Sequence, residues 1–260
     1  MTDRTADYEA TNREFWDRDA DDYQEVHEPQ LSATDGRWGV WAIPESDIEA
    51  LGDVSGLDVL ELGCGGAQHA NGVARDARRR VGLDQSVAQL RHAVANLERA
   101  ELRMPLVCAS ATATPFRDES FDVVFCDHGA MSFCDPYATV PEASRLLRPD
   151  GLLVFNCSTL FRNLFFPTDD PDALITRTRH SAYFGARAFD WGDGTIDFQI
   201  PHGEWIRLFA AHGLVVEDLI ELQPPPDAET TFPDFADLSW ARSWPGEEIW
   251  RVRKISGGRR

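Results

Sequence analysis

Short apolar runs alternate with amphipathic stretches through the middle of the chain. The apolar runs are "LDVLEL", "RVGLD", "PLVCA", "FDVVFC" and "LLVFNC", at residues 57–62, 80–84, 105–109, 121–126 and 152–157. Runs of about four to eight apolar residues between turn signals are typical of strands that are buried on both faces of a sheet. Because helical patterns separate these strands, the sequence predicts an α/β fold with a parallel sheet covered by helices.

Helical spacing follows most of these strands. Ser86 opens one helix with a capping box, because Gln89 stands three places further on. Further helices are expected at residues 67–78, 137–147 and 202–213, and two late strands at residues 214–222 and 248–255. Residues 158–201 are rich in aromatics and show no clear period, which favours a lid or binding element.

The length of 260 residues fits one domain with additions. We expect a leader or cap at residues 1–50, a ligand-binding core at 51–157, an insertion at 158–201 and the C-terminal part of the core at 202–260. The polar, acidic opening lacks the apolar run of a signal peptide, and no stretch reaches membrane-spanning length. These features predict a cytoplasmic protein without a membrane partner.

The charge balance argues against a nucleic-acid partner. The chain has 44 acidic and 25 basic residues, a net charge of −19, and its only lysine is Lys254. Such a field repels polyanions, and the dense basic run at residues 75–80 is interpreted as a solvated helix end. The five cysteines form no C-x-x-C pair, so we interpret them as small buried hydrophobes and expect no metal site.

The strongest chemical signal is the glycine-rich turn in "VLELGCGGAQHA", residues 59–70. Gly63 and Gly65 fit a dinucleotide fingerprint, but Gln68 stands where its last glycine belongs, and no P-loop Lys is present. Glu61 would repel a pyrophosphate and attract a cationic ligand. Asp84 follows Gly63 by 21 residues, where an acid can bind a ribose diol, a position that alone would suit NAD equally well.

Several segments in a fixed order resemble the class I S-adenosylmethionine-dependent methyltransferases, of the small-molecule type 11 group related to ubiquinone and menaquinone biosynthesis. They are "VLELGCGGA", "VGLDQS", "TPFRDESFDVVFC", "EASRLLRPDGLLVF" and "RVRK", and the resemblance covers roughly residues 12–254. It implies a Rossmann-like methyltransferase fold with a seven-stranded, mostly parallel sheet, an antiparallel last strand and helices on both faces. The segments "EFWDRDADDYQ" and "WGVWAIPE" look like the group's leader, which folds over the active site.

The resemblance implies S-adenosyl-L-methionine as cofactor and assigns roles to matching residues. The methionine end would be lined by Glu61, Gly63, Cys64, Gly65 and Asp127. Asp84 would hold the ribose hydroxyls. The adenine side would be formed by Ser110, Ala111, Gln85 and Gln89.

Two positions depart from the family pattern. Ala67 replaces the usual third glycine, a tolerable change if the backbone there is helical. Ser110 replaces the usual acid before the adenine-contacting Ala111, so adenine recognition would rest on the Ser110 hydroxyl and the backbone of Ala111.

The substrate side is defined less sharply. His128, after the fourth strand, is the candidate general base, because a neutral imidazole can take a proton from a hydroxyl; a packed histidine is the alternative. Aromatic residues of the leader and the insertion are candidates for an apolar pocket, with Trp16, Trp38, Trp41 and Tyr183 as its representatives. They suggest a small, apolar or aromatic substrate.

Other functions stay open at this stage. A non-catalytic S-adenosylmethionine-binding protein of the same fold and a protein methyltransferase are the main alternatives. An NAD-dependent oxidoreductase is opposed by Gln68 and by the later segments. The sequence names neither the acceptor atom, nor the substrate, nor whether the protein is a monomer or a homodimer.

Overall fold

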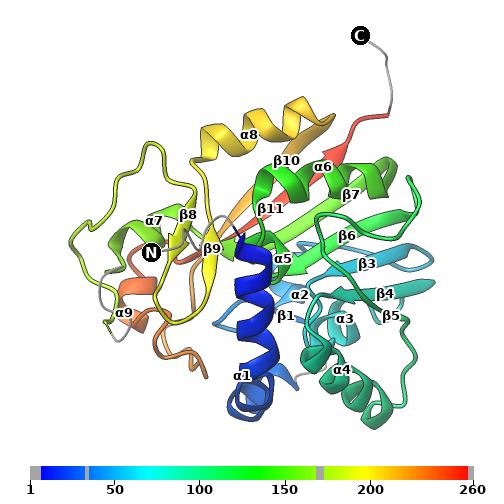
Figure 1. Ribbon diagram of the computed structural model, residues 1–260, viewed down its shortest axis with the longest axis horizontal. Coiled ribbons are helices and arrows are strands. Elements are labelled where there is room, and N and C mark those ends of the chain that lie inside the picture. Colours follow the sequence, from blue (N-terminus) through cyan, green and yellow to red (C-terminus); the bar gives the residue numbers. More distant parts are fainter. Residues whose placement is uncertain (1–6, 33–34, 168–172, 257–260) are drawn as a thin grey trace.

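A computed structural model of the chain describes residues 7–32, 35–167 and 173–256 (Figure 1). Its centre is a seven-stranded sheet with the order β10-β11-β7-β6-β3-β4-β5. β11 pairs antiparallel with both β7 and β10, and the other pairs in this sheet are parallel. The strands are β3 (Asp58–Leu62), β4 (Arg79–Asp84), β5 (Leu106–Cys108), β6 (Phe121–Asp127), β7 (Leu147–Ser158), β10 (Leu214–Leu222) and β11 (Glu247–Lys254). The predicted fold class, with an antiparallel last strand, is confirmed.

Helices cover both faces of this sheet because successive strand residues point to opposite sides. In β3, Leu60 packs into one apolar core and Val59 into the other. The first core is covered by α5 (Ala130–Phe133), α6 (Pro136–Leu146) and α8 (His202–Ala211), and the second by α2 (Glu45–Ile48), α3 (Gln68–Val73) and α4 (Val87–Arg99).

Helix α3 is shorter than the predicted helix at residues 67–78. It contains Asn71 and Gly72, which are weak helix formers, and it ends at Val73. A turn at residues 74–76 and an isolated bridge from Ala77 to Ser55 replace the predicted second half of the helix. The N-cap of α4 forms as expected, with the Ser86 hydroxyl accepting a hydrogen bond from the Gln89 amide at 3.1 Å. The reciprocal half of the predicted capping box is replaced, because the Ser86 amide donates to Asp84 and the Gln89 side chain accepts from Gln24.

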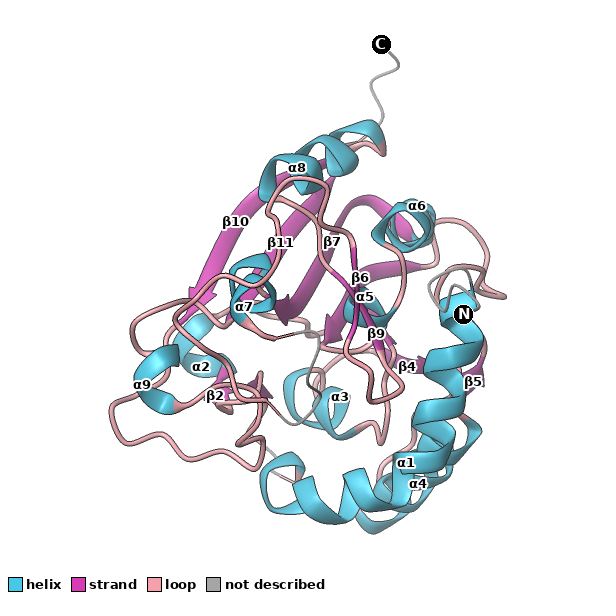
Figure 2. Ribbon diagram, turned by 60° about the vertical axis from the view of Figure 1, so that its left-hand side comes forward, coloured by secondary structure: helices cyan, strands magenta, loops and turns pink. Residues whose placement is uncertain are grey.

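A third apolar cluster lies at one end of the sheet, and we call the segments that build it the cap (Figures 1 and 2). The cap joins residues 158–201, residues 223–246 and the hairpin at residues 37–44. Its elements are α7 (Leu160–Phe165), the β8–β9 hairpin (Ala188–Asp190 and Ile196–Phe198), α9 (Leu238–Ala241), β1 (Arg37–Trp38) and β2 (Ile43–Pro44). Residues 168–172 of the interval lie outside the described residues.

Helix α1 (Tyr8–Leu31) runs beside α4 in both views (Figures 1 and 2). The Ser86 hydroxyl donates a hydrogen bond to Asp17 at 2.7 Å. The buried Asn12 side chain donates to the carbonyls of Phe133 at 2.7 Å and Ile196 at 2.9 Å, and accepts from the Ile196 amide at 2.8 Å. The leader is therefore tied to the core and to the cap at once.

The cysteines and the lengths of the helices also bear on the expectations from the sequence. All five cysteines are free, and four are buried as expected, but Cys108, on the short strand β5 at the sheet edge, is exposed. Among the helices that the structure describes, none is long and apolar enough to cross a membrane.

Candidate functional site

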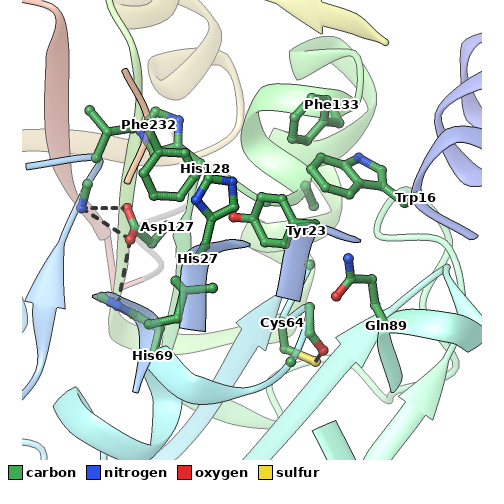
Figure 3. Close-up of a pocket in the computed structure, with 18 of the residues that line it drawn as sticks. Trp16, Tyr23, His27, Cys64, His69, Gln89, Asp127, His128, Phe133 and Phe232 are labelled. Atoms are coloured by element: carbon green, nitrogen blue, oxygen red, sulfur yellow. Dashed lines mark hydrogen bonds and ion pairs between the residues drawn. The ribbon is translucent and has the colours of Figure 1, made fainter. Parts of the chain in front are cut away.

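A cavity of about 780 Å³ opens where β3, β4 and β6 end. The glycine turn, Asp84 and Asp127 line one part of it, and residues of α1 and the cap line the rest. Figure 3 shows Cys64 and Gln89 at one side of this cavity and the rings of Trp16, Tyr23 and Phe133 beside them. Strand ends in an open α/β sheet are the usual location of ligand sites.

The glycine turn needs glycine for two different reasons. Gly63 has a φ of +72°, and a Cβ there would overlap the Ala130 amide, so this glycine is required by packing inside the protein. Gly65 has a φ of +48°, its amide donates to Asp84 at 2.9 Å, and a Cβ would meet only Gln89 at 3.7 Å. The face of Gly65 toward the cavity is therefore open to a ligand.

The backbone at Ala67 is not helical, contrary to the condition under which alanine could replace the family's usual glycine. Its φ of +58° lies in the left-handed region, so the backbone is not helical there, and a side chain at this position is strained. The family's usual glycine would relieve that strain.

Asp84 is held at the end of β4 by backbone amides. One carboxylate oxygen accepts from Gly65 at 2.9 Å and the other from Ser86 at 2.8 Å. Burial raises the pKa of Asp84, and these two amides lower it in part. Each carboxylate oxygen has a second lone pair, so Asp84 keeps acceptor capacity for a ligand hydroxyl.

Glu61 is a buried acid that has no cationic partner among residues 7–32, 35–167 and 173–256. Its side chain is 3% exposed, and its Oε2 atom makes no hydrogen bond within the described part of the chain. Burial, followed by the charge of Asp127, raises the pKa of Glu61 well above its usual value. A cationic group beside it would favour the carboxylate form.

Asp127 is fixed at the end of β6. Its carboxylate accepts from the Asn156 side chain at 2.7 Å and from the Gly39 amide at 3.2 Å, and it lies 3.7 Å from His69 Nδ1 (Figure 3). Burial lowers the pKa of His69, which favours the neutral imidazole. Sequence reasoning did not anticipate His69, although it lies in the quoted turn segment.

His128 forms a pair with a carboxylate from the other end of the chain. Its Nε2 lies 2.6 Å from Glu247 Oε1, which also accepts from the Val40 amide at 2.9 Å and from Asn156 at 3.1 Å. Burial alone would lower the pKa of His128, but the hydrogen bond and charge of Glu247 and the charges of Asp127 and Asp197 raise it. The backbone φ of +53° at His128 is strained, as is common at functional sites.

Aromatic rings enclose the part of the cavity beyond His128. Trp16 packs edge-on against Phe133 at 5.2 Å between ring centroids, and His27 stacks on Phe232 at 3.8 Å. Figure 3 places Tyr23 between these two pairs. The loop at residues 231–235, which supplies Phe232 and Phe235, was not predicted as part of the pocket.

The structure brings together most of the residues predicted for the site. The cavity is lined by Glu61, Gly63, Cys64, Gly65, Asp84, Gln85, Gln89, Ala111, Asp127, His128 and Trp16. Four predicted residues do not line it: Ser110, Trp38, Trp41 and Tyr183.

Each of these four has another environment. The Ser110 hydroxyl donates to Glu9 of α1 at 3.2 Å. Trp38 is fully buried and donates to Glu45 at 2.5 Å, and Trp41 belongs to the apolar core of the cap. Tyr183 is 39% exposed and packs against Phe184.

The fold and the site together define a class of protein. A seven-stranded sheet with one antiparallel strand carries a glycine turn open to the cavity, an acid at the end of the next strand and a buried acid that pairs with no cation among the described residues. These residues fit a ligand that has a ribose and a cationic amino-acid end, and they lack a phosphate cradle. This is the arrangement of class I S-adenosylmethionine-dependent methyltransferases.

Comparison with known proteins agrees. Residues 60–155 match the family model described as "Methyltransferase domain". A ubiquinone biosynthesis O-methyltransferase of Alkalilimnicola ehrlichii is 29% identical over 156 residues, covering 53% of this chain and 62% of that protein. A Mycolicibacterium smegmatis protein named "Probable S-adenosylmethionine-dependent methyltransferase" is 37% identical over 125 residues, covering 48% of this chain and 46% of that protein.

Among solved structures, an S-adenosylmethionine-dependent methyltransferase from Mesorhizobium loti is similar with a TM-score of 0.61 at 18% identity, covering 80% of this chain and 95% of that one. This likeness concerns the fold. The chain carries, at residues 60–155, a methyltransferase domain of the class I S-adenosylmethionine-dependent type. It spans 62% and 46% of the two curated relatives, so their activities do not transfer directly.

Proposed function

We propose that the protein transfers a methyl group from S-adenosyl-L-methionine to a hydroxyl group of a small apolar or aromatic molecule. The observation that carries this proposal is a single cavity that joins the glycine turn and Asp84 to an aromatic compartment containing His128. An enzyme of this kind needs both sites in one enclosed volume, because the acceptor must lie in line with the donated group.

The glycine-turn side suits the cofactor. Asp84 would accept hydrogen bonds from the ribose hydroxyls, and Glu61 with the open face of Gly65 would hold the methionine end. Gln85 and Ala111, which also line the cavity, would flank the adenine. When bound, the cofactor supplies a methyl group that is already activated on a sulfonium.

The aromatic side suits the acceptor. The rings of Trp16, Phe133 and Phe232 present apolar surface, which favours a flat or apolar substrate and keeps water out. Curated relatives at about 30% identity are O-methyltransferases of ubiquinone biosynthesis, which supports an oxygen acceptor. The structure of this compartment does not resemble an open groove for a polymer, since α1 and the cap roof it.

His128 is proposed as the general base. If its Nε2 proton is donated to Glu247, the lone pair of Nδ1 is free to accept the hydroxyl proton of the substrate. Because the pKa of His128 is raised, the imidazolium persists to higher pH than in a free histidine, and the basic form dominates only above that raised pKa. Transfer to an acidic hydroxyl would need this base less than transfer to an alcohol.

The cofactor assignment is tested by calorimetry with S-adenosylhomocysteine. Asp84→Ala should weaken binding by roughly 1.5–3 kcal/mol, about tenfold or more, because it removes a charged hydrogen-bond acceptor. Asp218→Ala, at an exposed position of β10, is the matched control and should bind like the unaltered protein. Unchanged affinity in Asp84→Ala, or tighter binding of NAD, would remove the assignment.

Turnover is tested separately. The protein is incubated with S-adenosylmethionine and a set of hydroxylated aromatic compounds, and products are searched by mass spectrometry for the added methyl group. Formation of S-adenosylhomocysteine together with a methylated product supports the enzyme. Tight cofactor binding without any methylated product would favour a non-catalytic binding protein.

A further inference from the structure

One positive charge is buried in the aromatic compartment. Arg162 is the third residue of α7, lines the cavity and is only 7% exposed. The hydroxyl of Thr159 caps α7 by accepting from the Arg162 amide at 2.9 Å, which fixes the start of the helix and the position of this side chain.

Aromatic rings stack around the guanidinium. Its Cζ atom lies 4.3 Å from the ring centroid of Phe235, 4.5 Å from that of Phe166 and 5.6 Å from that of Trp191. Rings over the planar faces of an arginine favour the cation and leave its hydrogen-bonding edge as the side that can meet a partner.

That edge is only partly satisfied. Nε donates to the Phe235 carbonyl at 3.2 Å and Nη1 to the Asn163 side chain at 3.3 Å, and both acceptors are neutral. Within the described ranges, Nη2 makes no hydrogen bond, is not enclosed by protein, and the guanidinium forms no ion pair. Burial lowers the pKa of Arg162 to about 10, so the group stays charged at neutral pH.

The charges of Asp197 and Glu247 attract Arg162, but neither carboxylate forms a hydrogen bond or ion pair with it within the described ranges. Glu247 is already engaged by His128, Val40 and Asn156. Burial raises the pKa of Asp197 to about 6, even though the charge of Arg162 opposes that shift. A buried cation without a contacting anion is unfavourable, and a ligand anion in the cavity would provide the missing partner.

We propose that Arg162 binds a carboxylate group of the acceptor, so that the substrate is a small carboxylic acid with an aromatic or apolar body. A planar carboxylate matches the guanidinium edge, and the surrounding rings match the body. The His128 ring lies 5.8 Å from the same Phe235 ring that covers Arg162. One substituted ring can therefore bridge from the carboxylate anchor toward the base.

This proposal rests on the proposed function, and its test separates the two. S-adenosylhomocysteine binding is measured first, and its absence counts against the methyltransferase alone. Benzoate, 4-hydroxybenzoate, cinnamate and hexanoate are then titrated into the loaded protein, each beside its uncharged amide. At least one acid should bind about tenfold or more tightly than its amide, a preference of the size that a charged hydrogen bond gives.

Arg162→Gln should abolish that preference while leaving S-adenosylhomocysteine affinity unchanged, which also shows that the variant is folded. Arg162→Lys should restore part of the preference for the acid, because lysine keeps the positive charge but lacks the planar set of donors that matches a carboxylate. Arg187→Gln is the matched control, since Arg187 pairs with Asp135 outside the cavity. Equal binding of every acid and its amide in the unaltered protein, or an acid preference that survives Arg162→Gln, would overturn the proposal.

Discussion

The buried carboxylate of Glu247 contacts His128 at 2.6 Å, and this contact sets the protonation of the proposed base. Glu247→Gln should lower the pKa of His128, because it removes the negative charge that favours the imidazolium. NMR titration of the histidine ring signals, with His128 assigned from a His128→Asn variant, measures this directly. The acid limb of any pH–rate profile should move to lower pH with it.

Glu248 provides the control for that substitution. It is the next residue of β11, is equally buried, and contacts His202 at 2.8 Å instead of His128. Glu248→Gln should leave the His128 titration in place and shift that of His202 downward. An unmoved His128 signal in Glu247→Gln would show that the contact does not govern the pKa.

The contact between His128 and Glu247 also makes the free energy of unfolding depend on pH. The pKa of His128 is raised in the folded protein, so its contribution to the free energy of unfolding is fully present below the unfolded value, about 6.5, and is lost as the pH rises through the folded value.

Residues near one another in sequence were the predictable part of the site. Glu61, Gly65 and Asp84 follow from one turn and from the end of the next strand, and the cavity contains all three. Glu247, Asn156 and Arg162 gave no local signal, because they reach the site through pairing of β11 with β7 and through α7. Ser110 was assigned by position, but its hydroxyl bonds Glu9 because α1 lies beside it.

At the scale of elements, α1 and the cap roof the cavity, so ligand binding should restrain them. Hydrogen exchange in residues 15–31, 36–41 and 231–235 should slow when S-adenosylhomocysteine is added. With the ligand at one hundred times its dissociation constant, binding stabilises the closed state by at most about 2.7 kcal/mol. Amides whose opening requires release of the ligand should therefore exchange up to roughly a hundredfold more slowly.

Helix α8 supplies the internal control, since none of its residues lines the cavity. Its amides should exchange at the same rate with and without ligand. If residues 15–31 and 231–235 also exchange at unchanged rates, α1 and the cap are not a ligand-responsive roof.

Helices and strands whose sequences have a strong hydrophobic periodicity were predictable, and segments without such periodicity were not. The strands of the sheet and α4 appear close to where their patterns place them, except that β7 begins at Leu147, five residues before the predicted strand. The interval at residues 158–201 has no clear period, yet it contains α7 and the β8–β9 hairpin. Its order comes from packing of Leu160, Phe166 and Trp191 against other cap residues, a tertiary contribution that no local pattern carries.

At the scale of the whole molecule, a net charge of −19 predicts stabilisation by salt. Added KCl screens the mutual repulsion of the acidic surface, and the Debye length falls to about 3 Å at 1 M. Surface ion pairs such as that of Arg253 with Glu217 are screened too, but each contributes little. The melting temperature should rise by several degrees, about 1 kcal/mol or more, between 0.1 and 2 M KCl by estimates for domains of this size. A melting temperature that stays constant or falls would contradict this.

The hairpin at residues 37–44 limits where the chain can be divided into separate modules. The Gly39 amide donates to Asp127 and the Val40 amide donates to Glu247, so two adjacent residues of this hairpin hold acids from the middle and the end of the chain. The part matching the family model starts only at residue 60. A module that keeps both contacts must therefore begin before residue 37, because a recombination joint at residue 60 would remove the amide donors of Gly39 and Val40.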